Sequence, residues 1–133
     1  MASFRNQGLD HVALSVADLE RSAAFYAEVM GLERAYEQWH EPVFMVTEGG
    51  EGVATGVALF RRESHPASGP DDAEPAIRTH HVAFRTDRDG FEAARAELEW
   101  RGLEVSFIDH VACHSIYFED PDGHKLELTT YEV

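Results

Sequence analysis

The chain has 133 residues, and its 25 acidic residues outnumber its 11 basic residues, which gives a formal net charge of −14. This excess of negative charge repels phosphate backbones, so we expect no nucleic acid among the partners. The first ten residues contain no apolar stretch and no segment approaches the ~18 apolar residues of a membrane span, so we expect neither a signal peptide nor a membrane partner. The single cysteine, Cys113, cannot form an internal disulfide, which favours a cytoplasmic location.

The first predicted elements are a strand at 11–16 and a helix that begins after Asp18. The strand alternates apolar and polar residues, which is typical of a strand with one buried face. Asp18 is a favourable helix cap, and Gly31 follows the helix at a position where glycine commonly ends one. Two apolar segments, VFMV at 43–46 and GVALF at 56–60, then predict a hairpin.

The second half of the chain repeats this order of elements. A strand at 81–86 precedes a helix that starts at Asp87 or Asp89 and ends at Gly102. Three further strands are predicted from the apolar segments VSFI, SIYF and KLELTTY, and EDPDGH forms the turn between the last two.

Two segments of the chain resemble each other at an offset of 70 to 71 residues. HVALSVADLERSAAFYAEVMGLE, which begins at His11, aligns with HVAFRTDRDGFEAARAELEWRGLE, which begins at His81, once one residue is inserted. The residues between the two copies are rich in Pro, Ser, Gly and acids, which is typical of a loop. The repeat predicts one domain over residues 1–133, made of a βαβββ module at about 8–63, a linker at about 64–77 and a second βαβββ module at about 78–133.

The alternation of the strands places four chemically capable side chains on the face that points away from the helices. Alternate residues of a strand share a face, and the apolar residues mark the face that packs on the helix. The opposite face then carries His11, His81, Tyr117 and Glu127. If the two modules join edge to edge, this face lines a shared cleft.

Two imidazoles and one carboxylate in one cleft are suitable ligands for a divalent metal. A single histidine at a strand start is more often a polar surface residue, but His11 and His81 occupy equivalent positions of a repeat. Shifting Glu127 back by the repeat offset leads near Val57, whose neighbours are poor ligands, so we expect three protein ligands: His11, His81 and Glu127. Such a set with open positions is typical of non-haem Fe(II) and oxygen chemistry.

The sequence resembles the vicinal oxygen chelate superfamily over nearly its whole length, as a single-domain member. The matching segments are GLDHVALSVADLERSAAFYAEVMGLE, THHVAF and SIYFEDPDGHKLEL. This superfamily includes glyoxalase I, extradiol dioxygenases, fosfomycin resistance thiol transferases and bleomycin resistance proteins. The resemblance implies an α+β fold in which two tandem βαβββ modules form a curved eight-stranded mixed sheet around a metal cleft. It also implies a homodimer, a small-molecule substrate, and His11, His81 and Glu127 as metal ligands.

The segment IDHVACHSIYFEDPDGHKLE resembles the signature of the extradiol dioxygenases, with His110, Tyr117 and Glu127 at the matching positions. The resemblance implies that His110 and Tyr117 are catalytic residues that orient substrate and oxygen, with His110 as acid or base. We therefore expect an Fe(II) enzyme that cleaves the ring of a catechol-like aromatic, with Mn, Zn or Ni as alternative metals.

Other features favour different members of the superfamily. Extradiol enzymes place a catalytic histidine near the start of the strand that matches GVALF, where this chain has Thr55 and Gly56. Fosfomycin resistance proteins share HSIYFEDPDGHK. A glyoxalase-type isomerase, a fosfomycin-type thiol transferase and a small-molecule (antibiotic) binding protein therefore stay as alternatives. The roles of His40, His65 and His114 stay open, and His124, in the turn, is expected to be solvated.

Overall fold

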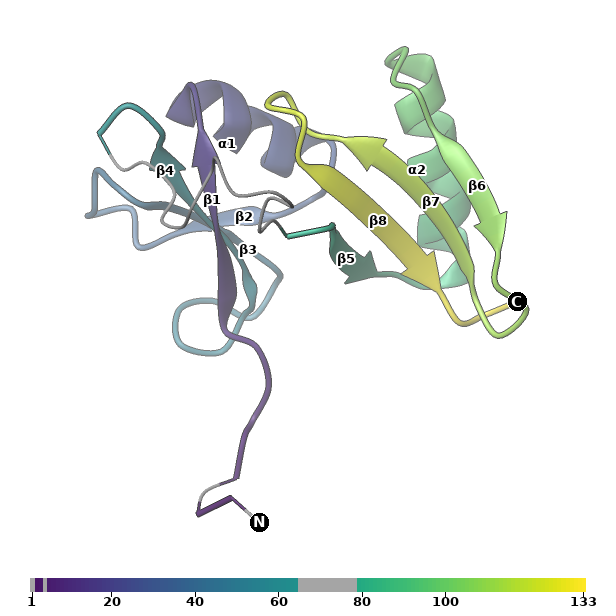
Figure 1. The fold of residues 1–133 in the computed structure, drawn as a ribbon, viewed down its shortest axis with the longest axis horizontal. Helices are drawn as coiled ribbons and strands as arrows, with labels where there is room; N and C mark the ends of the chain where they lie inside the picture. Colours follow the sequence, from purple (N-terminus) through teal and green to yellow (C-terminus); the bar gives the residue numbers. More distant parts are fainter. Residues whose placement is uncertain (1, 4, 65–78) are drawn as a thin grey trace, which may run out of the picture.

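The computed structural model describes residues 2, 3, 5–64 and 79–133, so the predicted linker at about 64–77 lies outside the described residues except for Ser64. These residues form two modules, each with a four-stranded sheet and one helix (Figure 1). No helix of this part of the chain is long and apolar enough to cross a membrane.

The first module follows the predicted order of elements and adds one strand. It consists of β1 (His11–Val16), α1 (Leu19–Glu28), β2 (Glu33–Ala35), β3 (Val43–Val46) and β4 (Gly56–Arg61). The strand order is β1-β4-β3-β2, with β1 parallel to β4 and the other pairs antiparallel. Strand β2 was not assigned from the sequence, because its three residues, ERA, carry no apolar alternation.

The second module repeats the arrangement. Its elements are β5 (Val82–Arg85), α2 (Arg88–Trp100), β6 (Ser106–Asp109), β7 (His114–Glu119) and β8 (Lys125–Thr130), in the strand order β5-β8-β7-β6. The predicted α+β fold of tandem βαβββ modules is thus confirmed. Within the described chain the eight strands lie in two four-stranded sheets, because the edge strands β1 and β5 are not hydrogen-bonded to each other.

Both helices begin at an aspartate that caps the first turn. Asp18 accepts a hydrogen bond from the backbone N–H of Arg21 at 3.0 Å, and Asp87 accepts one from Gly90 at 2.7 Å. Each carboxylate satisfies a backbone donor that has no partner inside the helix. Asp87, rather than Asp89, is therefore the cap of α2.

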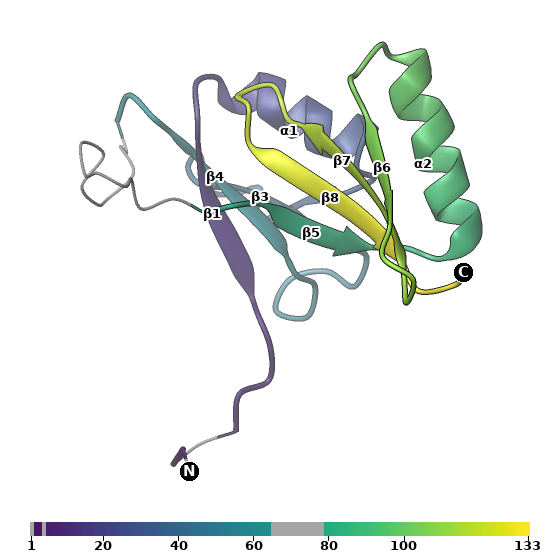
Figure 2. The ribbon, with the colours of Figure 1, turned by 45° about the vertical axis from the view of Figure 1, so that its right-hand side comes forward.

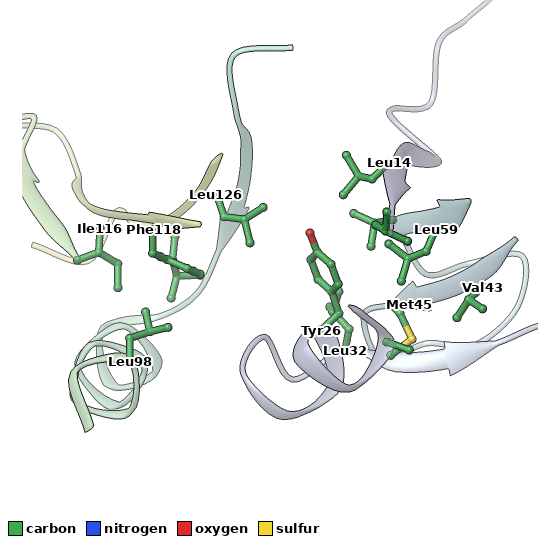
Figure 3. Packing of buried hydrophobic residues seen from close by; sticks show 14 of the residues in the cluster. Leu14, Tyr26, Leu32, Val43, Met45, Leu59, Leu98, Ile116, Phe118 and Leu126 are labelled. Atoms are coloured by element: carbon green, nitrogen blue, oxygen red, sulfur yellow. The ribbon is translucent and has the colours of Figure 1, made fainter. Parts of the chain in front are cut away.

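One hydrophobic core extends across the two modules on the helix side of both sheets. Figure 3 shows side chains of the second module, among them Leu98 and Phe118, on one side and those of the first module on the other. Tyr26 and Phe91, on the two helices, are among the largest fully buried side chains. Burial of this apolar surface is the main favourable contribution to folding of each module.

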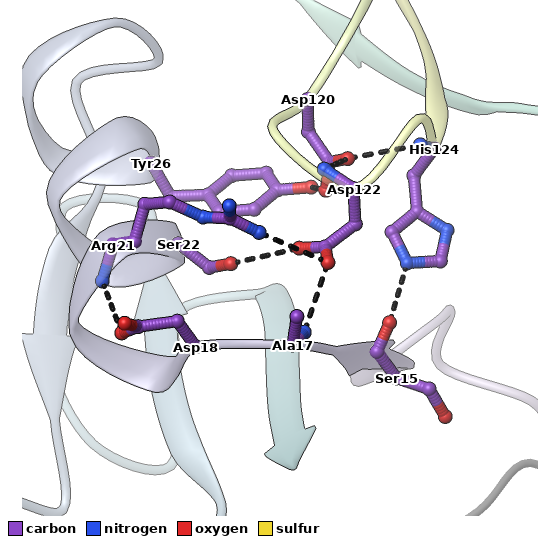
Figure 4. A network of polar contacts seen from close by, with 9 residues as sticks. All are labelled: Ser15, Ala17, Asp18, Arg21, Ser22, Tyr26, Asp120, Asp122 and His124. Carbon is purple, nitrogen blue, oxygen red and sulfur yellow. Dashed lines mark hydrogen bonds and ion pairs between the residues drawn. The ribbon is translucent and has the colours of Figure 1, made fainter. Parts of the chain in front are cut away.

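A polar network joins the turn between β7 and β8 to the start of α1 (Figure 4). Asp122 accepts hydrogen bonds from the backbone N–H of Ala17 at 2.9 Å, from the hydroxyl of Ser22 at 3.1 Å and from the guanidinium of Arg21 at 3.2 Å. The buried hydroxyl of Tyr26 donates to Asp120 at 2.9 Å. In Figure 2 the same turn lies beside α1, so these contacts hold the two modules together.

The turn is also closed from within. The second oxygen of Asp120 accepts from the backbone N–H groups of Asp122 and His124, both at 2.9 Å. The ring Nε2 of His124 lies 2.7 Å from the carbonyl oxygen of Ser15 and therefore donates to it. The expectation that His124 is solvated is wrong, because this half-buried side chain bridges the turn to β1.

We predict that Tyr26→Phe lowers the free energy of unfolding by about 1.5–3 kcal/mol, the usual cost of losing a hydrogen bond to a charged group. Burial, followed by the charge of Asp120, raises the pKa of Tyr26, so its hydroxyl stays a donor at neutral pH. Urea unfolding measures the change. Tyr131→Phe, at an exposed tyrosine, is the matched control and should shift stability by less than about 0.5 kcal/mol. Equal effects of the two changes would contradict the role of Tyr26.

Candidate functional site

In the strands that carry candidate residues, the structure agrees with the predicted alternation of buried and exposed side chains. In β1 the residues Leu14 and Val16 are buried, whereas His11 and Ala13 are exposed. In β7 and β8 the buried apolar residues alternate with Tyr117 and Glu127 in the same way. The face away from the helices therefore carries the four candidate residues, as the alternation predicts.

His81 and Glu127 form a close pair on this face of the second sheet. The ring Nε2 of His81 lies 2.9 Å from one carboxylate oxygen of Glu127. The other oxygen accepts a hydrogen bond from the hydroxyl of Ser115, on β7, at 2.7 Å. Because both oxygens are engaged and the Glu127 side chain is only 12% exposed, its orientation is fixed.

The spacing of this pair suits a metal ion. Two ligands in adjacent positions of an octahedral ion, each at about 2.1 Å, lie about 3 Å apart. The 2.9 Å between His81 Nε2 and Glu127 Oε1 matches that spacing, so the two atoms could become neighbouring ligands with little movement.

His80 supports the orientation of the His81 ring. The two Nδ1 atoms lie 2.7 Å apart, and the rings meet edge to face with their centroids 4.9 Å apart. A hydrogen bond to the second ring nitrogen of a ligating histidine commonly fixes the tautomer and the ring plane. His80 and Ser115 were not predicted as part of the site. Ser115 lies two residues before Tyr117 on β7 and therefore on the same face, so the alternation rule could have predicted it.

His110 and Tyr117, the two residues that the resemblance implied to be catalytic, are in contact. The ring Nε2 of His110 lies 3.0 Å from the hydroxyl of Tyr117, and Tyr117 is the direct cross-strand partner of Glu127. Burial, followed by the negative charge of Glu127, raises the pKa of the Tyr117 hydroxyl. The phenol is therefore protonated at neutral pH, and it shares a hydrogen bond with the ring of His110.

His11 lies apart from this group, on β1 of the other sheet. Its Nδ1 atom is 2.7 Å from a carboxylate oxygen of Asp10, and its ring packs against Phe44 at a centroid distance of 5.0 Å. Among the described residues, no three His, Cys, Asp or Glu side chains gather where they could hold a metal. A single chain thus brings together two of the three predicted ligands, and the three-ligand site stays a prediction.

The strand register identifies the position in the first module that corresponds to Glu127. Ala83 pairs with Glu127 across β5 and β8, and Ala13 pairs with Ala58 across β1 and β4. The counterpart is therefore the fully buried Ala58, one residue from the position estimated from the repeat. Because alanine has no ligand atom, the first module offers no carboxylate at this position, as expected.

The remaining histidines lie elsewhere. His114 Nε2 is 3.5 Å from a carboxylate oxygen of Asp109, and its ring packs edge to face on Phe107. His40 is exposed in the loop between β2 and β3. His65 lies outside the described residues.

Comparisons with known proteins agree on the family of the chain. The family model of the Glyoxalase/Bleomycin resistance protein/Dioxygenase superfamily matches residues 8–128. Glutathione transferase FosA of Serratia marcescens is 31% identical over 122 residues, which cover 92% of this chain and 79% of that protein. Metallothiol transferase FosB of Staphylococcus haemolyticus is 32% identical over 127 residues, which cover 93% of this chain and 84% of that protein. The solved structure of the fosfomycin resistance protein FosX from Listeria monocytogenes has the same fold, with a TM-score of 0.67 at 24% identity over 95% of this chain and 94% of that one.

We predict that His81→Ala and Glu127→Ala each weaken binding of a divalent metal by more than 100-fold and leave the fold intact, because each removes an atom of the fitted pair. Ser115→Ala, which removes only a support of Glu127, should weaken binding by about 10–100-fold. Glu92→Ala, at an exposed glutamate of α2, is the control and should bind like the wild type. Titration with Mn²⁺ and circular dichroism provide the measurements. Wild-type metal affinity in either ligand variant would exclude this pair as the site.

Proposed function

Because the chain belongs to the glyoxalase/bleomycin resistance protein/dioxygenase superfamily, we propose that it is a metal-dependent enzyme that transfers a thiol to an electrophilic carbon of a small molecule. The observation that carries this proposal is the 2.9 Å pair of His81 and Glu127, which fits a metal. The similarity to FosA and FosB, two thiol transferases by name, extends over more than nine-tenths of this chain and supports the choice of reaction.

The donor atoms of His81 and Glu127 would hold the metal. When bound, a divalent ion acts as a Lewis acid on the oxygen atoms of a chelated substrate. A nitrogen and oxygen donor set suits Mn, Zn, Ni or Fe(II). The preference for Fe(II) rested on oxygen chemistry, which the thiol transferase relatives do not support. We therefore propose a metal that does not change its oxidation state during the reaction.

We propose that a second copy of the chain supplies the third ligand. Strands β1 and β5 are open edges of the two sheets, and such edges are usually paired or covered. His11 begins β1 and His81 directly precedes β5. If β1 of one copy lies beside β5 of the other, His11 of the partner subunit approaches the pair of His81 and Glu127. A two-fold axis then completes two equal sites and joins the strands into eight-stranded sheets.

The residues around the pair have the properties that thiol addition needs. The sulfur–carbon bond forms while a carbon–oxygen bond, such as that of an epoxide, breaks, and the released oxygen takes up one proton. Tyr117 is a protonated donor beside Glu127, and its contact with His110 at 3.0 Å provides a path for that proton. The thiol loses one proton as it reacts, so the overall reaction is balanced without an oxidant. A cytoplasmic location, which we also propose, would supply reduced thiols.

Extradiol ring cleavage is the second candidate, because the two residues that match its signature, His110 and Tyr117, lie 3.0 Å apart. The relatives do not support this reaction. In addition, the extradiol enzymes have a catalytic histidine near the position where β4 starts, and this chain has Thr55 and Gly56 there. A Cβ atom at Gly56 would overlap the carbonyl oxygen of Met45, so this position has no room for a larger side chain.

We predict that the Mn²⁺-loaded protein forms an adduct between glutathione or cysteine and an epoxide such as fosfomycin, and consumes no oxygen with catechol. Mass spectrometry of the product and an oxygen electrode test the two reactions in parallel. His110→Gln should lower turnover by about 10²–10⁴-fold at unchanged metal content. Tyr117→Phe should lower it by about 10–100-fold, since one hydrogen bond to a charged group is lost. Tyr131→Phe is the matched control. Oxygen consumption without any thiol adduct would favour the second candidate instead.

We predict that mixing two inactive variants, His11→Ala and Glu127→Ala, restores activity. Half of the randomly mixed dimers are heterodimers with one intact site each, so about one quarter of the sites should be intact. A mixture of His81→Ala and Glu127→Ala is the control, because both changes affect the same half of every site. Lack of recovery in the first mixture, with subunit exchange verified by mass, would contradict a site that is shared between two subunits.

A further inference from the structure

Aromatic side chains, rather than a helix, cover the outer face of the first sheet. Here a second, smaller hydrophobic cluster is buried on the side opposite α1, and it consists of Ala35, Phe44, Val46 and Ala58. Tyr36 packs against this cluster from the loop that follows β2, and Trp39 lies on Tyr36. We refer to Tyr36, Trp39 and Phe44 as the aromatic wall.

The aromatic wall is built next to His11. The rings of Tyr36 and Trp39 are stacked, with centroids 4.7 Å apart and planes 9° apart. Both rings meet Phe44 edge to face, at 5.2 and 5.8 Å. Phe44 is also in contact with the imidazole of His11, with the ring centroids 5.0 Å apart. A molecule bound at His11 would therefore lie within reach of the aromatic wall.

The wall is held in place before any ligand binds. The hydroxyl of Tyr36 accepts a hydrogen bond from Gly52 at 3.1 Å, and its backbone N–H donates to Glu51 at 3.2 Å. Tyr36 has a φ of 54°, a left-handed conformation that is costly for a residue with a side chain. Backbone strain of this kind persists where surrounding contacts enforce it, and it is concentrated at binding sites.

Exposure and charge point to the kind of group that the wall would bind. Trp39 remains 44% exposed although Phe44 beneath it is only 9% exposed, so an aromatic surface faces outward over a packed base. The described strand residues on this face are His11, Ala13, Ser15, Glu33, Ala35, Phe44, Val46, Gly56, Ala58 and Phe60, and none of them is Lys or Arg. These strand residues thus favour an uncharged planar group and offer no Lys or Arg to a small anion.

We infer that the aromatic wall is a subsite for a planar aromatic group of the substrate, next to the end of the substrate that chelates the metal. This inference rests on the proposed function, because it takes His11 as a metal ligand. The substrate class is then an electrophile with metal-binding oxygens and an aromatic ring. Rings prefer offset-stacked or edge-to-face contacts, and Trp39, which is 44% exposed, has surface left for such a contact.

Phenylphosphonate and methylphosphonate form a matched pair of probes, since they share the chelating group and differ in the ring. Binding is followed on the Mn²⁺-loaded protein by the fluorescence of Trp39 in a Trp100→Phe background, because the chain has only these two tryptophans. We expect phenylphosphonate to bind about tenfold more tightly. Calorimetry on the Trp39 variants should show that Trp39→Ala removes this preference and that Trp39→Phe retains most of it. Trp100→Ala, at a residue that is 81% exposed on α2, should change neither affinity.

Three results would overturn the inference. The first is that the wild type binds the two phosphonates equally. The second is that Trp39→Ala weakens the binding of both phosphonates equally. The third is that Trp39→Ala converts a dimer to a monomer, which would make the wall a subunit contact. The Glu127→Ala variant separates this inference from the proposed function. Binding of both phosphonates that does not depend on Mn²⁺ or Glu127 would contradict the metal site, whereas loss of the phenyl preference alone would contradict the subsite.

Discussion

The contact between the β7–β8 turn and the start of α1 determines how the two modules are arranged. Asp122 accepts three hydrogen bonds there, and one comes from a backbone N–H group at the positive end of the helix, where a carboxylate is favourable. Asp120 is 5% exposed and is satisfied by Tyr26 on one oxygen and by the turn itself on the other. Because a buried carboxylate without partners is costly, the turn has one favourable position against α1. The strands that carry Tyr117 and Glu127 lead directly into this turn.

This arrangement of the modules separates the predicted ligands within one chain. The modules share a core on the helix side of their sheets, so the opposite faces, which carry His11 and the pair of His81 and Glu127, are separate within one chain. The edge strands β1 and β5 stay available for pairing with a second copy. If the site forms between copies, metal binding and association support each other, because each stabilises the state that the other requires. The shared core then favours assembly between chains over closure within one chain.

The sequence was sufficient for the features that follow from local periodicity. The alternation in β7 and β8 placed Tyr117 and Glu127 on one face, and the aspartate caps located the helix starts. Strand β2 was missed because its pairing with β3, not its composition, makes it a strand. The roles of Asp122 and His124 were missed for another reason: their partners lie about 100 residues away, at Ser22 and Ser15, and no local pattern records such contacts. The position of His11 relative to Glu127 depends on the arrangement of the modules and could not be derived from the alternation of residues along a strand.

The choice between reactions depends on the residues around the pair more than on the pair itself. His81, Glu127 and the contact of His110 with Tyr117 can hold a chelating substrate for either thiol transfer or oxygen chemistry, since both need bound oxygens and a proton path. What differs is the first module. There Gly56 lies opposite His11 in the strand register and has no space for a catalytic side chain, Ala58 replaces the carboxylate, and Phe44 fills the place beside the imidazole. In the proposed site the two modules would thus differ in role: the second would hold the reacting atoms, and the first would supply one ligand and an apolar surface. Such a surface would exclude water from a bound metal and so strengthen its effect on chelated oxygens, which would assist addition of a thiolate without any change of oxidation state.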